Sequence, residues 1–206
     1  MQKKLLLIGF VLFLLFVCFS YLVHKGVFEQ FDFDTTVKLQ NHISQKFDTL
    51  FSLLSLIGSF EVVSLFLLFI LFLKRKLSTV FVLFFYISLH LFELFGKVFV
   101  SHPGPPFLFF RYDIPFLFPS SYVQPGSSYP SGHAARFVFL SVILFPIIIK
   151  TERISLFAKV VFLGLILFID LIMLLSRVYL GEHWASDVIG GGLLGLSLGF
   201  FSIAVI

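Results

Sequence analysis

Six long apolar stretches, separated by short clusters of charge, constrain the fold of this chain more than any other feature. A helix needs about 20 predominantly apolar residues to cross a bilayer. Six segments meet that requirement: 5–23, 55–73, 77–100, 131–149, 155–177 and 183–206. Hydrophobic residues make up 59% of the 206 residues, more than a soluble domain of this size could bury. The sequence therefore predicts an all-α fold, a polytopic membrane protein built as a bundle of six transmembrane helices.

Two connecting segments are too long and too polar to be simple turns. Residues 24–54 are expected to lie outside the bilayer, with an interfacial amphipathic helix as one possibility. Residues 101–130, rich in proline, serine and aromatic residues, are expected to form a structured loop. The first apolar stretch is longer than a usual signal-peptide core and no small-residue cleavage site follows it, which favours a membrane span. Residues 1–206 are expected to form a single membrane-embedded domain.

The basic residues suggest an orientation in the membrane. Lys and Arg accumulate on the cytoplasmic side of membrane proteins, and tight basic clusters flank one set of span ends: Lys3-Lys4, Lys74-Arg75-Lys76, and Lys150 with Arg153 and Lys159. The opposite side mixes basic with acidic residues. We therefore expect both termini in the cytoplasm and a location in the cell (plasma) membrane. The net charge of +4 follows from this topology, and no nucleic-acid partner is expected.

The first chemically suggestive motif is Pro130-Ser131-Gly132-His133, directly before the fourth span. Serine is a good helix N-cap, and glycine lets the backbone approach a ligand closely. The free N–H groups at a helix start attract anions, and His133 would lie on the first turn beside such an anion. The simpler alternative is an ordinary capping turn with an interfacial histidine.

The second motif, Ser176-Arg177-x5-His183-x3-Asp187, connects the fifth and sixth spans. His183 and Asp187 are four residues apart and would share one helix face, where the carboxylate can orient the imidazole and raise its basicity. Arg177 can donate two parallel hydrogen bonds to a phosphate. The alternative is an interfacial His–Asp pair beside an arginine that reaches toward water.

Lys97, at the end of the third span, lies on the same predicted outer side as both motifs. The histidines and the carboxylate could in principle bind zinc. The surrounding lysine and arginine residues instead favour an anion, so neither a metal nor another cofactor is expected. The single cysteine, Cys18, excludes a disulfide or a cysteine-based metal site within one chain.

These blocks resemble the type 2 phosphatidic acid phosphatase superfamily, membrane lipid phosphatases that share an active-site architecture with vanadium haloperoxidases. The family pattern is Lys-x6-Arg-Pro, then Pro-Ser-Gly-His, then Ser-Arg-x5-His-x3-Asp. The second and third blocks match in full. The first departs from the pattern, because the seventh residue after Lys97 is Gly104 where the family has arginine. The resemblance includes the six-span layout and therefore extends over most of the chain.

The resemblance implies a role for each matching residue. His183 would be the nucleophile and form a phosphohistidine, Asp187 would orient it, and His133 would protonate the leaving oxygen and then help to activate water. The phosphoryl oxygens would be held by four groups: Lys97, Arg177, Ser131 and the backbone N–H of Gly132. Two basic residues could replace the arginine missing at Gly104. Arg136, one helical turn after His133, is favoured over Arg111 in the loop.

The resemblance implies a metal-independent phosphatase for lipid phosphates or diphosphates, with its active site on the extracytoplasmic side. Phosphatidic acid, phosphatidylglycerol phosphate and polyprenyl diphosphate are candidate substrates that the bilayer would supply. Two alternatives remain open: a lipid phosphotransferase on the same fold, and a non-catalytic lipid-phosphate-binding protein. The retained histidines and Asp187 speak against simple binding, because binding needs no nucleophile. The sequence leaves the oligomeric state open.

Overall fold

The structure, a computed structural model, describes residues 2–74, 79–119 and 126–205 and is helical without strands in these ranges. The predicted all-α class is therefore confirmed. The α-helices are α1 (Gln2–His24), α2 (Glu29–His42), α3 (Asp48–Ile57), α4 (Phe60–Lys74), α5 (Thr79–Phe99), α6 (Gly132–Lys150), α7 (Leu156–Tyr179) and α8 (Ala185–Val205). Two short 3-10 turns, η1 (Gln45–Phe47) and η2 (Phe107–Phe109), lie in the connecting segments.

Five helices, α1, α5, α6, α7 and α8, are each long and apolar enough to cross a membrane. A bent pair, in which Gln45–Ile57 and Phe60–Lys74 meet at 50°, passes the same test when it is taken as one broken span. The expected continuous span 55–73 thus contains a break at Gly58, a residue of low helix propensity. A Cβ atom at Gly58 would lie 2.9 Å from Cδ2 of His133. The break therefore lets the chain pass close to one of the two motif histidines.

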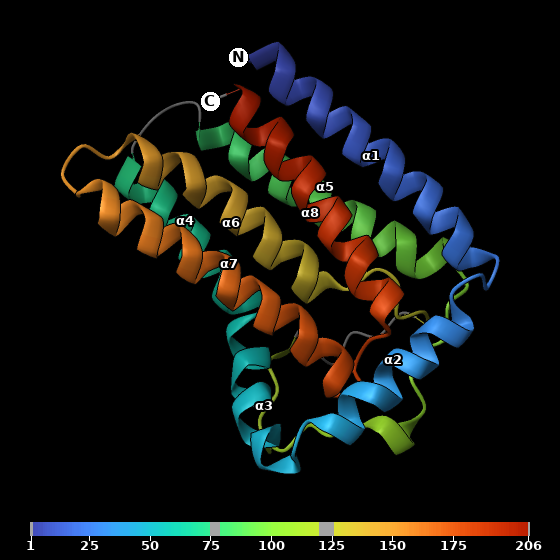
Figure 1. The fold of residues 1–206 in the computed structure, drawn as a ribbon. Helices are drawn as coiled ribbons and strands as arrows, with labels where there is room; N and C mark the ends of the chain where they lie inside the picture. Colours follow the sequence, from blue (N-terminus) through green and yellow to red (C-terminus); the bar gives the residue numbers. More distant parts are fainter. Residues whose placement is uncertain (1, 75–78, 120–125, 206) are drawn as a thin grey trace.

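The spans run roughly alongside one another, and both termini lie at the same end of the bundle (Figure 1). Helix α8 packs most extensively against α6 and α1 and also contacts α5. Helices α2 and α3 lie at the end opposite the termini (Figure 1). Helix α2 occupies the segment for which an interfacial helix was expected. If the bent pair is counted as one span, the described residues give six spans, and an even number agrees with the position of both termini at one end.

The close approach of α6 and α8 depends on glycine. A Cβ atom at Gly191 would lie 2.3 Å from the carbonyl oxygen of Ser131, and one at Gly195 would lie 2.4 Å from that of Ala135. Real side chains do not approach backbone oxygens so closely, so only glycine fits at these two positions. Small residues at this spacing allow helix backbones to pack tightly. The contact fixes the start of α6, which carries the first motif, against the start of α8.

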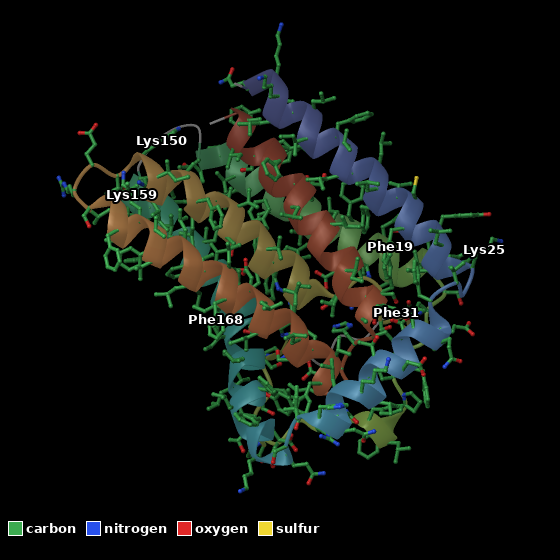
Figure 2. All side chains as sticks on the ribbon, viewed as in Figure 1. Phe19, Lys25, Phe31, Lys150, Lys159 and Phe168 are labelled. Carbon is green, nitrogen blue, oxygen red and sulfur yellow. The ribbon has the colours of Figure 1, made fainter. Side chains whose placement is uncertain are left out.

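The outward faces of the spans carry large apolar side chains, as a lipid-exposed surface requires. On α7, Phe168 is 58% exposed and projects from the surface of the helix bundle (Figure 2). Lys150 and Lys159 lie at the end that holds the termini, and Lys25 lies at the opposite end (Figure 2). Arg75 and Lys76 of the expected inner cluster are outside the described residues. The protein is an integral membrane protein, and which end faces the cytoplasm remains a prediction.

The orientation can be measured with single cysteines introduced after Cys18 has been replaced by serine. Ser101→Cys lies at the predicted outer end and Glu152→Cys between α6 and α7 at the predicted inner end, and both positions are exposed. A membrane-impermeant maleimide should label Ser101→Cys in intact cells and Glu152→Cys only after lysis. The reverse labelling pattern would place the motif residues in the cytoplasm.

Candidate active site

The Pro-Ser-Gly-His motif forms the turn that starts α6. Ser131 is fully buried and caps the helix, with its Oγ accepting a hydrogen bond from Ala134 N at 3.5 Å. The backbone N–H of Ser131 donates to the carbonyl oxygen of Asp187 at 2.9 Å. The structure thereby brings the first motif into direct contact with the second, although 43 residues separate His133 from Ser176.

His183 and Asp187 lie together where the chain enters α8. Nδ1 of His183 is 3.4 Å from Oδ2 of Asp187, and the same oxygen accepts a hydrogen bond from Trp184 N at 2.9 Å. Asp187 has no exposed surface, whereas His183 is partly exposed. A carboxylate can only accept, so Nδ1 of His183 carries the hydrogen and Nε2 is left with the lone pair. This arrangement suits a nucleophilic histidine.

A third side chain reaches Asp187 that the sequence motifs did not indicate. Nδ1 of His102, in the loop after α5, donates to the other oxygen of Asp187 at 2.8 Å. The opposite nitrogen of the His102 ring, Nε2, is 3.5 Å from Oδ2 of Asp32 in α2. Both residues are almost fully buried. No sequence signal pointed to Asp32, whereas the position of His102, five residues after Lys97, was a hint that could have been used.

Arg177 has no exposed surface and is held from several directions. Its Nη1 donates to Oγ of Ser55 at 2.6 Å and to Oε2 of Glu182 at 2.5 Å. Its Nε and Nη2 both donate to Oγ of Ser176. A phosphate that binds Arg177 would therefore have to compete with the carboxylate of Glu182.

Lys97 and Arg136 share one carboxylate at the start of α6. Oε2 of Glu93 is 3.2 Å from Nη1 of Arg136, and Oε1 is 4.0 Å from Nζ of Lys97. A Cβ atom at Gly132 would lie 2.0 Å from the Glu93 carboxylate and 2.7 Å from Nη1 of Arg136. The two basic side chains are thus at the helix start where an anion is expected. Nε of Arg136 is buried and has no hydrogen-bond partner among the described residues.

His133 is partly buried on the first turn of α6. Its side chain lies close enough to Arg177, Arg136, Lys97 and His183 for their charges to act on it. The two motif histidines therefore belong to one cluster of basic side chains. An imidazole in a cationic environment suits proton transfer to and from an anionic substrate.

Gly104, where the family arginine is missing, and Arg111, one of its two possible replacements, lie in the loop after α5. A Cβ atom at Gly104 would lie 3.6 Å from the Ser128 side chain, an ordinary contact. Arg111 is turned toward the end of α7, where its Nη1 donates to the Tyr179 hydroxyl at 3.2 Å and its backbone N–H donates to Leu180 O. The structure thus gathers Arg136 with Lys97 at the helix start and directs Arg111 to Tyr179.

A cavity of about 420 Å³ opens beside this cluster. Its lining combines Lys97 and His102 with apolar residues at the end of α5 and directly after it: Val98, Phe99 and Val100. In the described ranges, no three histidine, cysteine or acidic side chains are grouped so that they could hold a metal ion. The arrangement thus joins basic and apolar surfaces, as an amphiphilic anion requires.

A family model described as the PAP2 superfamily matches residues 78–206, more than half of the chain. The chain belongs to this superfamily. The crystal structure of a transmembrane PAP2-type phosphatidylglycerolphosphate phosphatase from Bacillus subtilis is similar, with a TM-score of 0.76 at 20% identity, and the match covers 95% of this chain and 94% of that one. The crystal structure of Aquifex aeolicus LpxE has a TM-score of 0.61 at 23% identity, over 84% and 94% of the two chains. A search of curated proteins gave no match. The resemblance to the superfamily is confirmed, and the similar structures show a shared fold.

Proposed function

We propose that this PAP2 superfamily member is a lipid phosphatase that hydrolyses phosphate or diphosphate esters through a phosphohistidine at His183. The observation that carries the proposal is the contact of His183 with the buried carboxylate of Asp187, beside the basic residues Lys97, Arg136 and Arg177. Phosphoryl transfer mainly requires a positioned nucleophile and positive charge around the phosphoryl oxygens. A pure phosphate-binding protein would need the positive charge without the nucleophile.

In the first step, Nε2 of His183 attacks phosphorus and the bond from phosphorus to the leaving oxygen breaks. His133 gives a proton to the leaving oxygen, while Asp187 stabilises the charge that develops on His183. The oxygens of the transferred group would be held by Lys97, Arg177, the Ser131 hydroxyl and the Gly132 backbone N–H. In the second step, His133 takes a proton from water, the water oxygen attacks phosphorus, and inorganic phosphate leaves while His183 is regenerated.

We propose a membrane lipid as the substrate because apolar and basic surfaces meet at the site. Val98, Phe99 and Val100 line the cavity next to Lys97, so an acyl or prenyl chain could lie against α5 while its phosphate enters the basic cluster. Phosphatidic acid, phosphatidylglycerol phosphate and polyprenyl diphosphate all satisfy this requirement. On the orientation predicted above, the site faces the extracytoplasmic side.

The proposal predicts that purified protein in detergent releases phosphate from at least one of these three lipids, and that EDTA leaves the rate unchanged. The expected resistance to EDTA follows from the basic residues around both histidines, which attract an anion and repel a cation. Phosphate release should be measured for each lipid with and without EDTA. Activity that EDTA abolishes and zinc or magnesium restores would overturn the metal-independent mechanism. Phosphate that appears on an added alcohol, with none released to water, would identify a transferase.

A second prediction concerns the arginine missing at Gly104. We propose that Arg136 partly replaces it, because its free Nε and its position at the start of α6 suit contact with a phosphoryl oxygen. Arg136→Ala should lower kcat/KM about tenfold or more, since one well-placed donor contributes roughly 2–4 kcal/mol to transition-state stabilisation. Arg111→Ala is the comparison. Loss of activity in Arg111→Ala with normal activity in Arg136→Ala would assign the role to the loop arginine.

The partner of Arg136 provides a control for this experiment. Arg136 could act only by neutralising Glu93 beside Gly132, in which case Glu93→Gln should restore the activity of Arg136→Ala. If Arg136 contacts the phosphoryl group, the double variant should remain impaired. Kinetics of the two single variants and the double variant separate these roles.

A further inference from the structure

Four buried or partly buried side chains form a continuous line of polar contacts that ends at the proposed nucleophile, His183. Asp32 is 3.5 Å from Nε2 of His102, Nδ1 of His102 is 2.8 Å from Asp187, and Asp187 is 3.4 Å from Nδ1 of His183. The family pattern supplies Asp187 and His183 only. His102 therefore occupies the oxygen of Asp187 that His183 does not use.

The far end of this line is firmly anchored. Asp32 is almost fully buried, and its two oxygens accept hydrogen bonds from the backbone N–H and the hydroxyl of Ser186, at 2.7 and 2.6 Å. Ser186 lies next to Asp187 in the first turn of α8. Asp32 thus holds both the backbone beside Asp187 and the ring of His102. A carboxylate whose two oxygens are already held by hydrogen bonds can fix the orientation of an imidazole.

We propose that His102 is a positioning residue that holds the carboxylate of Asp187 in place against His183, and that Asp32 in turn orients His102. This inference rests on the proposed function, since it concerns how the nucleophile is aligned. His102 acts through Asp187 and makes no contact with the reacting atoms, although its ring also lines the cavity next to Lys97. Its loss should therefore lower kcat more than it raises KM.

The charge state of His102 supports the same role. Burial alone would lower the pKa of the His102 imidazole, but the hydrogen bonds and charges of Asp187 and Asp32 outweigh burial and raise the pKa from 6.5 to about 9. The ring of Tyr129 packs edge-on against His102 and faces it from the loop before α6. The pKa of His102 is higher in the folded protein than in the unfolded chain. The charged ring therefore makes its full contribution to the stability of the folded protein below about pH 6.5, and that contribution is lost as the pH rises through about 9.

The experiment compares two amides that imitate different nitrogens of the His102 ring. In His102→Asn the amide nitrogen can take the place of Nδ1 and donate to Asp187. In His102→Gln it can take the place of Nε2 and reach Asp32 instead. Loss of an outer partner that orients a metal-binding side chain typically costs 10–100-fold, and we expect a similar cost for a residue that orients a catalytic carboxylate. We expect His102→Gln and His102→Ala to lose at least roughly tenfold in kcat, and His102→Asn to stay within about threefold of wild type.

His42→Asn is the matched control, because His42 is exposed at the end of α2 and its Nδ1 is hydrogen-bonded to the carbonyl oxygen of Lys38 in the same helix. This variant should have wild-type kcat and KM. Each variant should also be checked by its elution profile and melting temperature in detergent. Equal losses in His102→Asn and His102→Gln with normal folding would overturn the positioning role, because the contact with Asp187 would then make no difference.

The pH profile gives a second readout that needs no change at His102. In wild type, kcat should fall by up to about threefold as the pH rises through about 9, because His102 then loses one of its two ring protons and Asp187 and Asp32 compete for the other. Asp32→Asn removes one of the two carboxylates that raise this pKa, so the fall in kcat should begin at lower pH. Coincident profiles of wild type and Asp32→Asn would overturn the inference even if the His102 variants failed to fold.

The outcomes also separate this inference from the proposed function. A wild-type protein that releases no phosphate from any of the three lipids overturns the function and the inference together. An active wild type with unchanged kcat in folded His102→Gln and His102→Ala overturns the inference alone.

Discussion

His183→Ala should reduce kcat for phosphate release by on the order of 10⁴-fold or more, because removal of a nucleophile eliminates the covalent route. Asp187→Asn should cost less, since the nucleophile remains and its alignment and charge stabilisation are weakened. Initial rates on the preferred lipid, measured at saturating concentration, would establish both values. Wild-type protein quenched during turnover should also contain an acid-labile phosphoenzyme.

The control for His183→Ala is His42→Ala, which removes an exposed histidine from α2 and should leave both turnover and the phosphoenzyme unchanged. Near-normal turnover in folded His183→Ala would disprove the phosphohistidine mechanism. If the wild-type protein turned over none of the lipids, and lipid binding persisted in His183→Ala, the non-catalytic alternative would be favoured instead.

Gly195→Ala should destabilise the protein by about 3 kcal/mol, because a methyl group placed 2.4 Å from the carbonyl oxygen of Ala135 forces α6 and α8 apart. The obstacle is backbone, so no side-chain rotation can relieve the clash. For a chain of this size the melting temperature should fall by roughly 5–10 °C. Activity should fall as well, since the start of α6 carries Ser131 and His133.

Gly192→Ala is the matched control, because a Cβ atom there would meet nothing within 4 Å. Alanine has a better helix propensity than glycine by about 1 kcal/mol, so this variant should be as stable as wild type or slightly more stable. Both variants replace glycine by alanine in α8, so a difference between their melting curves in the same detergent would come from the surroundings of the added methyl group. Equal melting temperatures would show that the glycine contact does not hold the helices together.

Hydropathy and motif spacing were sufficient to predict the all-α membrane bundle and the superfamily. Both rest on local signals, namely the length of each apolar stretch and short runs of specific residues. The bend between α3 and α4 was not predicted, because Gly58 within an apolar run is compatible with a continuous helix. Only the packing of Gly58 against His133 and Met173 shows why the chain breaks there.

The line from Asp32 to His102 could not be predicted, because it joins two segments that looked like connectors. Asp32 lies among several acids in residues 24–54, and nothing in the sequence distinguishes a buried acid from a solvated one. The partners of the basic residues were equally hidden. The pairing of Glu93 with Lys97 follows from helical spacing, but its pairing with Arg136 depends on how α5 and α6 pack.

The family match begins at residue 78, yet contacts from the part of the chain before it reach into the site. Asp32 holds His102, and Ser55 accepts a hydrogen bond from Arg177. A chimaera that joined residues 78–206 to the first helices of a distant relative would retain every motif residue and lose both contacts. These two parts of the chain are therefore expected to have changed together in evolution, with substitutions at Asp32 or Ser55 tolerated only where their distant partners changed as well.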